Sequence, residues 1–266
     1  TVECIHQSVK DSVAYHKIAD VEVGSFLSGG VDSSYIASVL RPDKTYSVGF
    51  EVQGFDETTH ARDLCETLHL KNKKKTLTSK DFFDALPKVQ YYSDEPHANL
   101  SAVPLFYLSE MAVEDLKVVQ SGEGADAYKE NKNDELYKKI VPAALRKKLG
   151  HWAKGRAEKR GMGFLQRNAT SLEDSYIGQA FIMDNEDADE VMADGYKTAL
   201  CYQDVTRPYF ERVKEQDDLH KKMYLDMHLW LPHDILLKAD KMTMAHSLEL
   251  RVPFLDKEVW NLAKSL

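Results

Sequence analysis

The feature that most constrains the fold is a glycine turn between a β-rich run and a helical pattern. Residues 21–27 read Val-Glu-Val-Gly-Ser-Phe-Leu, and residues 28–33 read Ser-Gly-Gly-Val-Asp-Ser. Apolar residues then recur at helical spacing as far as Leu40, which predicts a helix from about Ser33. A strand, a tight turn and a helix in this order are typical of the first unit of a parallel α/β sheet.

The same alternation continues through the first half of the chain. We predict further strands at 45–50, 71–77 and 118–120, and helices at 2–13, 56–68, 81–92 and 103–112. The predicted fold class is therefore α/β, a parallel sheet with flanking helices, followed by a helical C-terminal part. Helical periodicity dominates from residue 129 onward, so we divide the chain into an α/β part, 1–128, and a helical part, 129–266.

Composition excludes several classes of protein. The 266 residues are 43% apolar, enough for a substantial core, and carry 35 Lys and Arg against 43 Asp and Glu. The formal net charge of −8 argues against a protein built to bind nucleic acid or an anionic membrane surface. No apolar stretch approaches the roughly 18 residues of a membrane span, and no signal peptide opens the chain. The three scattered cysteines form no CxxC pair and indicate no zinc site, so we expect a cytoplasmic protein.

The glycine turn has the composition of a phosphate-binding loop. Gly29 and Gly30 allow the backbone to approach a ligand closely, and the following helix directs its first N–H groups toward an anion. Ser28 and Ser33 add hydroxyl donors, and the Asp32 carboxylate can hold a magnesium ion that bridges phosphates. No lysine follows the glycines, so this is not the loop of kinase-type ATPases. The alternative is an ordinary strand-to-helix turn in which Asp32 and Ser33 only cap the helix.

Two further segments extend this pattern into a family resemblance. Residues 121–126 read Ser-Gly-Glu-Gly-Ala-Asp, and residues 237–256 contain Leu-Lys-Ala-Asp-Lys-Met-Thr-Met-Ala and Leu-Glu-Leu-Arg-Val-Pro-Phe-Leu-Asp. The loop 28–33 resembles the pyrophosphate loop of the N-type ATP pyrophosphatase superfamily. The three segments together resemble the synthetase domain of asparagine synthetases, and the likeness covers nearly the whole chain.

The resemblance implies a nucleotide site with ATP and Mg²⁺ as cofactors. Leu27 and Val48 match positions that contact adenine and ribose through backbone groups. Ser121 and Gly122 match a further nucleotide contact, and the loop 28–33 matches the pyrophosphate contact. The helical residues 129–266 would complete this site.

The resemblance also implies which groups carry the chemistry. Asp32 and Asp126 match an acidic pair that holds magnesium on the pyrophosphate. Glu123 matches a glutamate needed around the acyl-adenylate step, and Lys241 matches a lysine that reaches the α-phosphate. Without the family likeness, a solvated lysine on a helix surface is the simpler interpretation of Lys241.

The implied reaction is ATP-dependent asparagine synthesis. ATP activates the β-carboxylate of aspartate as β-aspartyl-AMP with release of pyrophosphate, and ammonia then displaces AMP. The chain begins with Thr1, so we expect it to be part of a longer protein in which a glutaminase domain, absent from this chain, supplies the ammonia. Aspartate and ammonia are the expected substrates, and a homodimer is compatible with the resemblance. Residues 93–101, around a Glu-Pro turn, resemble the border of the aspartate pocket.

Three alternatives stay open at this level. A β-lactam-forming synthetase would use the same adenylation with a different acceptor. A catalytically inactive nucleotide-binding scaffold is suggested by residues 127–129, Ala-Tyr-Lys, because family members usually continue with Glu-Leu-Phe-Gly-Gly-Tyr. A tRNA-modifying relative is disfavoured by the net charge of −8.

Overall fold

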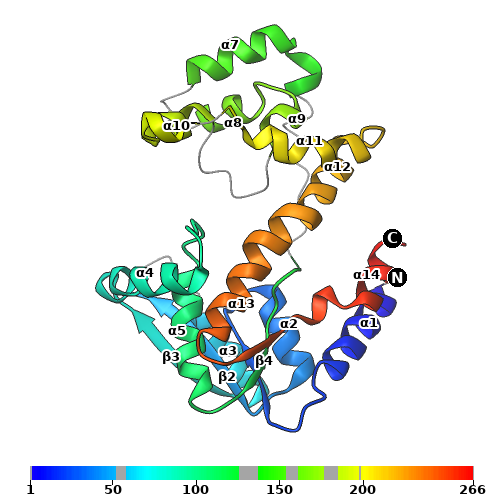
Figure 1. Cartoon of the computed structure of the whole chain (residues 1–266). Helices are drawn as coiled ribbons and strands as arrows, with labels where there is room; N and C mark the ends of the chain where they lie inside the picture. Colours follow the sequence, from blue (N-terminus) through cyan, green and yellow to red (C-terminus); the bar gives the residue numbers. More distant parts are fainter. Residues whose placement is uncertain are drawn as a thin grey trace. The chain divides into compact units, whose positions relative to one another are not determined.

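Strands and helices alternate along the first half of the chain, as predicted. The computed structural model describes residues 2–51, 58–125, 137–153, 161–176, 185–197 and 199–265. The elements of the first half are β1 (Val23–Phe26), β2 (Lys44–Phe50), β3 (Lys71–Leu77), β4 (Val118–Gln120), α1 (Val2–Tyr15), α2 (Val31–Leu40), α3 (Thr58–Leu68), α4 (Ser79–Ser93) and α5 (Ala102–Val113) (Figure 1). The predicted α/β class, a parallel sheet with flanking helices, is confirmed.

Strand β1 lies at the centre of a parallel sheet with the strand order β3-β2-β1-β4-β5. Its register pairs Ser25 with Thr45 of β2 and Val23 with Val118 of β4. The fifth strand, β5 (Glu249–Arg251), was not predicted and pairs with β4. From β1 the chain adds β2 and β3 on one side and then crosses to place β4 on the other.

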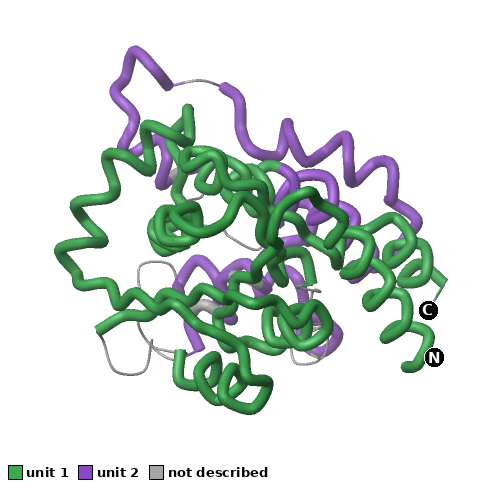
Figure 2. Tube along the Cα trace, turned by 90° about the horizontal axis from the view of Figure 1, so that it is seen from below, with its two compact units in different colours: residues 1–126, 233–266 green, residues 127–232 purple. Residues whose placement is uncertain are grey.

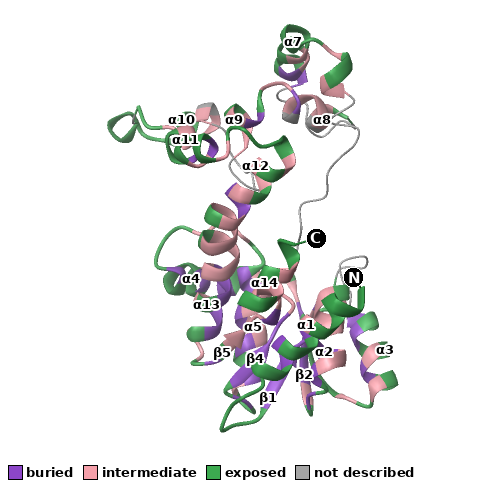
Figure 3. Ribbon diagram, turned by 90° about the vertical axis from the view of Figure 1, so that its right-hand side faces the viewer, coloured by how far each residue is buried: buried purple, intermediate pink, exposed green. Residues whose placement is uncertain are grey.

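The core follows the alternation of side chains along a strand, in which successive residues face opposite sides of the sheet. Val118 of β4 packs on one face with Val9, Val13, Val23, Ile36 and Leu40. The next residue, Val119, packs on the other face with Phe26, Tyr46, Met111, Ala112, Leu116 and Leu248. Helices α1 and α2 therefore cover one face and α5 covers the other, so that β1 and β4 are buried between them (Figure 3).

The chain divides into two compact units, one of residues 1–126 with 233–266 and the other of residues 127–232 (Figure 2). The division predicted from the sequence lies at residue 128, with all later residues in a helical part. Residues 233–266 group with the sheet because β5 extends it, and because the Arg251 guanidinium donates to two backbone carbonyls just after α1, each at 2.8 Å. This unit ends with α13 (Leu237–Met244), η3 (Pro253–Leu255) and α14 (Lys257–Ala263).

The regular structure described in the second unit is helical. Its elements are α7 (Ala143–Ala153), α8 (Met162–Arg167), α9 (Leu172–Ser175), α10 (Asn185–Val191), η1 (Asp194–Tyr196), α11 (Tyr202–Arg212) and α12 (Asp218–Leu225), and a π-helical segment, η2 (Asp226–Leu236), precedes α13 in the chain. Leu172, Phe210 and Leu225 form a buried cluster in this unit. Within the described ranges, no helix of either unit has the length and apolar character needed to cross a membrane.

Candidate nucleotide and amide-forming site

The carboxyl ends of β1 and β4 form the part of the sheet where a ligand is expected. In open parallel sheets, the ligand crevice lies outside the carboxyl ends of two neighbouring strands at which the strand order reverses. β1 and β4 are these strands, because β2 and β3 lie on the other side of β1. The two glycine turns, at 28–30 and 121–124, directly follow these two strands.

Gly122 brings the two turns into direct backbone contact. A Cβ atom built at Gly122 would lie 2.6 Å from the backbone nitrogen of Ser33 and 2.8 Å from the carbonyl carbon of Asp32. Both distances are shorter than a side chain tolerates, so only glycine allows the second turn to pack against the start of α2. Two motifs that lie far apart in sequence are thus in contact at the carboxyl ends of β1 and β4.

The loop 28–33 is held by its own hydroxyl groups. The Oγ atoms of Ser28 and Ser33 lie 2.9 Å apart, and the backbone N–H groups of Gly30 and Ser28 donate to them, each at 3.2 Å. Gly29 has a φ of 96°, which favours glycine at that position. Gly30 is the N-cap of α2 and makes no side-chain cap hydrogen bond, so the amino end of this helix suits a phosphate.

The donor set of this loop fits a magnesium–pyrophosphate group. Asp32 lies half-buried in the first turn of α2 and carries the hard carboxylate oxygens that Mg²⁺ prefers. The hydroxyls of Ser28 and Ser33 and the helix amino end add donors for phosphate oxygens. Asp126, the second expected magnesium ligand, lies outside the described residues, as do residues 127–129.

Leu27 and Val48, expected to contact adenosine, belong to the sheet and its core. Leu27 is 1% exposed; its N–H donates to the Tyr46 carbonyl at 2.9 Å, and its own carbonyl accepts from the Ser47 hydroxyl at 2.6 Å. Val48 is half-buried and packs against the core on the α5 side. The backbone N–H of Leu27 is therefore used by the sheet, and its carbonyl retains a second lone pair for a ligand.

The turn after β4 presents Glu123. The N–H of Ser121 donates to the Arg251 carbonyl of β5 at 3.0 Å, and the buried Ser121 hydroxyl accepts from the Glu123 N–H at 3.3 Å. The Glu123 carboxylate, 28% exposed, lies 3.6 Å from the Nζ atom of Lys238. The unpredicted strand β5 thus anchors the turn that carries the expected catalytic glutamate.

Lys238, three residues before Lys241, is the lysine that the structure brings to Glu123. Its side chain is 5% exposed, whereas that of Lys241 is 33% exposed. Lys241 instead donates to the Asp94 carboxylate at the end of α4, and this hydrogen bond raises the pKa of Lys241. Lys238 was not among the predicted site residues, although its spacing carries a signal. It lies four residues before the buried Met242 and so shares the inner face of α13.

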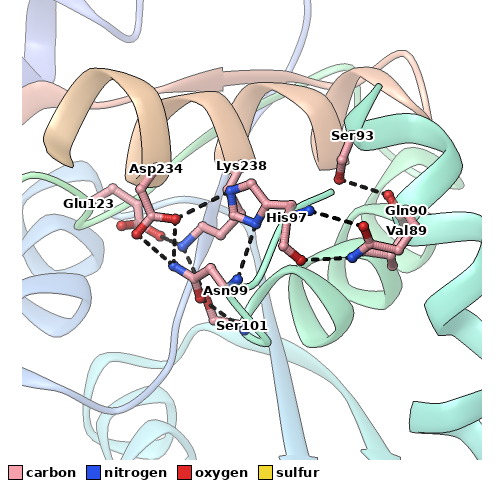
Figure 4. A network of polar contacts seen from close by, with 9 residues as sticks. All are labelled: Val89, Gln90, Ser93, His97, Asn99, Ser101, Glu123, Asp234 and Lys238. Carbon is pink, nitrogen blue, oxygen red and sulfur yellow. Dashed lines mark hydrogen bonds and ion pairs between the residues drawn. The ribbon is translucent and has the colours of Figure 1, made fainter. Parts of the chain in front are cut away.

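A polar network joins α13 to the segment 97–101 (Figure 4). Lys238 donates to the Ser101 hydroxyl at 3.0 Å, and Asn99 donates to both carboxylate oxygens of Asp234, at 3.2 and 3.1 Å. Asp234 also lies 3.2 Å from Nε2 of His97, whose backbone exchanges two hydrogen bonds with the side-chain amide of Gln90. The segment that resembles the border of an amino-acid pocket is thus fixed beside Glu123 by the residues of one helical stretch.

A separate hollow lies at the opposite edge of the sheet. A cavity of about 820 Å³ is lined by residues that precede β1 and β4 and by residues around β5, among them Val21, Lys117 and Glu249. Ligands of parallel α/β proteins bind at the carboxyl ends of the strands, and this cavity is at the amino ends. We therefore assign the site to the glycine turns and not to this cavity.

Fold and site together define an α/β protein in which two contacting glycine turns, at the carboxyl ends of neighbouring strands, suit a phosphorylated ligand. The chain belongs to the asparagine synthase family, since the family model described as "Asparagine synthase" matches residues 5–266.

Individual relatives extend over the whole chain. Asparagine synthetase [glutamine-hydrolyzing] 1 of Bacillus subtilis is 42% identical over 277 residues, covering 100% of this chain and 44% of that protein. A Mycobacterium bovis protein whose name assigns it provisionally to the same class is 39% identical over 270 residues. This match covers 97% of this chain and 41% of that protein. The chain thus spans less than half the length of these relatives. A solved NH3-dependent NAD synthetase from Campylobacter jejuni is similar with a TM-score of 0.35 and 14% identity, covering 90% of this chain and 95% of that one.

Proposed function

We propose that this chain carries out ATP-dependent asparagine synthesis as the synthetase part of a longer protein. The observation that carries the proposal is the packing of Gly122 against Asp32 and Ser33, which brings the two glycine turns together next to Glu123. Membership of the asparagine synthase family supports the choice of reaction. The names of both relatives refer to the same activity.

In this proposal the two glycine turns hold ATP with its phosphates at the amino end of α2. The loop 28–33 binds the pyrophosphate through hydroxyl and backbone N–H groups. The backbones of Leu27 and Val48 contact the adenosine, and Ser121 and Gly122 contact the nucleotide from the β4 side. The close packing of the two turns supports a shared ligand.

The first step joins the β-carboxylate of aspartate to the α-phosphorus of ATP and releases pyrophosphate. Negative charge grows on the phosphate oxygens, and a positioned ammonium group stabilises it. Lys241 supplies this ammonium after its ion pair with Asp94 breaks. Breaking this pair requires little free energy, because the Asp94 carboxylate is 72% exposed and exposed ion pairs are weak. Magnesium held by Asp32 and Asp126 would supply further charge neutralisation.

The second step forms the amide. The nitrogen of ammonia attacks the acyl carbon, the bond from that carbon to the AMP oxygen breaks, and a proton leaves the nitrogen. Glu123 accepts this proton, because a carboxylate beside the adenylate is positioned for general base catalysis. In the longer protein, glutamine would supply the ammonia, as the "glutamine-hydrolyzing" names of the relatives suggest.

Product stoichiometry tests this proposal with ammonium as the nitrogen source. With ATP, Mg²⁺, aspartate and ammonium, we expect AMP, pyrophosphate and asparagine in equal amounts. ADP and phosphate as the products would contradict the proposal. Nucleotide binding without any turnover would also contradict it and would support an inactive scaffold.

A further inference from the structure

The glycine turn after β4 is held near both of its ends by one short segment, residues 251–255. At the start of the turn, the Ser121 N–H donates to the Arg251 carbonyl at 3.0 Å. At its end, Gly124 packs directly on Leu255. A Cβ atom built at Gly124 would lie 2.6, 2.7 and 2.9 Å from three carbons of the Leu255 side chain. The end of β5 and the η3 turn therefore border this glycine turn.

The residues just before Leu255 are themselves anchored to two helices. The Pro253 carbonyl accepts a hydrogen bond from the buried Ser12 hydroxyl of α1 at 2.8 Å. The Phe254 ring stacks on the Tyr35 ring of α2, with 6.3 Å between the ring centroids and 26° between the ring planes. Because its neighbours are fixed in this way, Leu255 presents a defined packing surface to the turn.

Two close contacts, two residues apart, determine where the turn lies. Gly122 meets the backbone of Ser33 at the start of α2, and Gly124 meets Leu255. Gly124 has a φ of 85°, a conformation that favours glycine, so the backbone itself approaches Leu255. A displacement of the turn at Gly124 would reach Gly122 through a single intervening residue. The packing at Leu255 therefore affects how the turn meets the phosphate-binding end of α2.

We propose that Leu255 is a positioning residue that fixes the turn 121–124 against the start of α2 and thereby sets the affinity for ATP. The inference rests on the proposed function, in which Ser121 and Gly122 contact the nucleotide. It adds a residue that lies outside both glycine turns and acts through Gly124. The Leu255 side chain has no charge and no hydrogen-bonding group, so its effect depends on packing, and the size of the side chain controls it.

The first measurement compares Leu255→Ala and Leu255→Met with Leu262→Ala, a control that truncates another half-buried leucine, in α14. ATP with Mg²⁺ is titrated by calorimetry at a temperature at which each variant is folded. For Leu255→Ala we expect an affinity about tenfold weaker, equivalent to one lost hydrogen bond to a charged group. Leu255→Met should keep most of the affinity because methionine fills a similar volume. Leu262→Ala should lower the Tm and leave the affinity unchanged.

A double variant tests the contact between the two residues. Gly124→Ala places a methyl group against Leu255 and also strains the backbone at its positive φ, so we expect it to weaken ATP binding. Truncation of Leu255 removes the first of these two effects. Gly124→Ala/Leu255→Ala should therefore bind ATP more tightly than the product of the two single losses predicts. Losses that combine independently would overturn the inference.

The comparison with the control separates positioning from a merely structural role. Equal affinities for ATP in Leu255→Ala and Leu262→Ala would overturn the inference. If Leu255→Ala does not fold, Leu255→Val removes a single methylene and should show a smaller loss of affinity, whereas an unchanged affinity would overturn the inference.

Failure of the proposed function gives a different result. A chain that shows these differences in ATP affinity and makes no asparagine would contradict the proposed function alone. An unmodified chain that does not bind ATP would overturn both.

Discussion

The backbone of Gly122 lies against the backbone of Ser33, at a distance that leaves no room for a β-carbon: a Cβ at Gly122 would be 2.6 Å from the Ser33 nitrogen. Gly122→Ala should therefore force the turn after β4 away from the start of α2. We expect a loss of about 1–3 kcal/mol in unfolding free energy, the usual range for overpacking, and a weaker affinity for ATP. Chemical denaturation and calorimetric titration with ATP measure the two effects.

Gly195→Ala is the matched control for this substitution. Gly195 lies in η1, and a Cβ there meets no atom within 4 Å. We expect the stability and ATP affinity of this variant to match those of the unmodified chain. If Gly122→Ala behaves in the same way as Gly195→Ala, the contact between the two turns does not shape the site.

Lys241→Met should slow adenylation while the fold is kept. Methionine preserves most of the side-chain length and removes the charge that we propose for the α-phosphate. The loss of one electrostatic contact to a transition state costs about a hundredfold in rate. Pyrophosphate exchange into ATP measures this step, with Lys80→Met as the control for loss of an exposed lysine. Exchange at the rate of the unmodified chain would show that Lys241 takes no part in adenylation and serves only in its surface ion pair with Asp94.

The contact between Tyr46 and Asp115 should make part of the unfolding free energy depend on pH. The buried Tyr46 hydroxyl donates to Asp115 at 3.1 Å, and this bond, more than the nearby Lys73, lowers the pKa of Asp115. A carboxyl group whose pKa is lowered in the folded state stabilises the fold at pH values above its ordinary pKa. This contribution is lost as the pH falls through the folded-state pKa. Tyr46→Phe should therefore cost about 1 kcal/mol near neutral pH, a modest loss because Asp115 is 35% exposed.

Thermal unfolding of Tyr46→Phe and the unmodified chain at several pH values checks this prediction. The difference in Tm between them should be largest at about pH 7 and should shrink at about pH 3, where carboxyl groups become protonated. A difference that is constant across this range would show that Asp115 contributes nothing through its charge.

The sheet was predictable from the sequence except for its last strand. The strands β1, β2 and β4 are short β-rich runs followed by turns. Strand β3 was predicted despite its run of lysines, which the sheet edge accommodates, with Lys73 and Lys75 paired to Glu114 and Glu110. Strand β5 has three residues, Glu-Leu-Arg, flanked by helices, and its identity as a strand depends on pairing with β4. Such a short segment carries no periodicity of its own, so only the tertiary structure defines it.

The candidate site was predictable in its loops and not in its polar network. The glycine turns could be recognised from their glycine content, because the backbone geometry requires glycine at positions such as Gly29 and Gly122. Lys238 and Lys241 are the same residue type three positions apart, and the sequence does not say which of them contacts Glu123. Their different burial and partners are seen only in the structure. Contacts of Asp234 with Asn99 join residues 135 positions apart, which no local pattern encodes.

In the proposed reaction, the β-carboxylate of aspartate attacks the α-phosphorus of ATP at this site. The most direct measurement uses aspartate labelled with ¹⁸O in that carboxylate, together with ATP, Mg²⁺ and ammonium, and mass spectrometry of the nucleotide products. We expect the AMP to carry an ¹⁸O atom from the carboxylate, because the bond between that oxygen and the acyl carbon breaks when ammonia displaces AMP. Unlabelled AMP, or ¹⁸O found in inorganic phosphate alongside ADP, would contradict it.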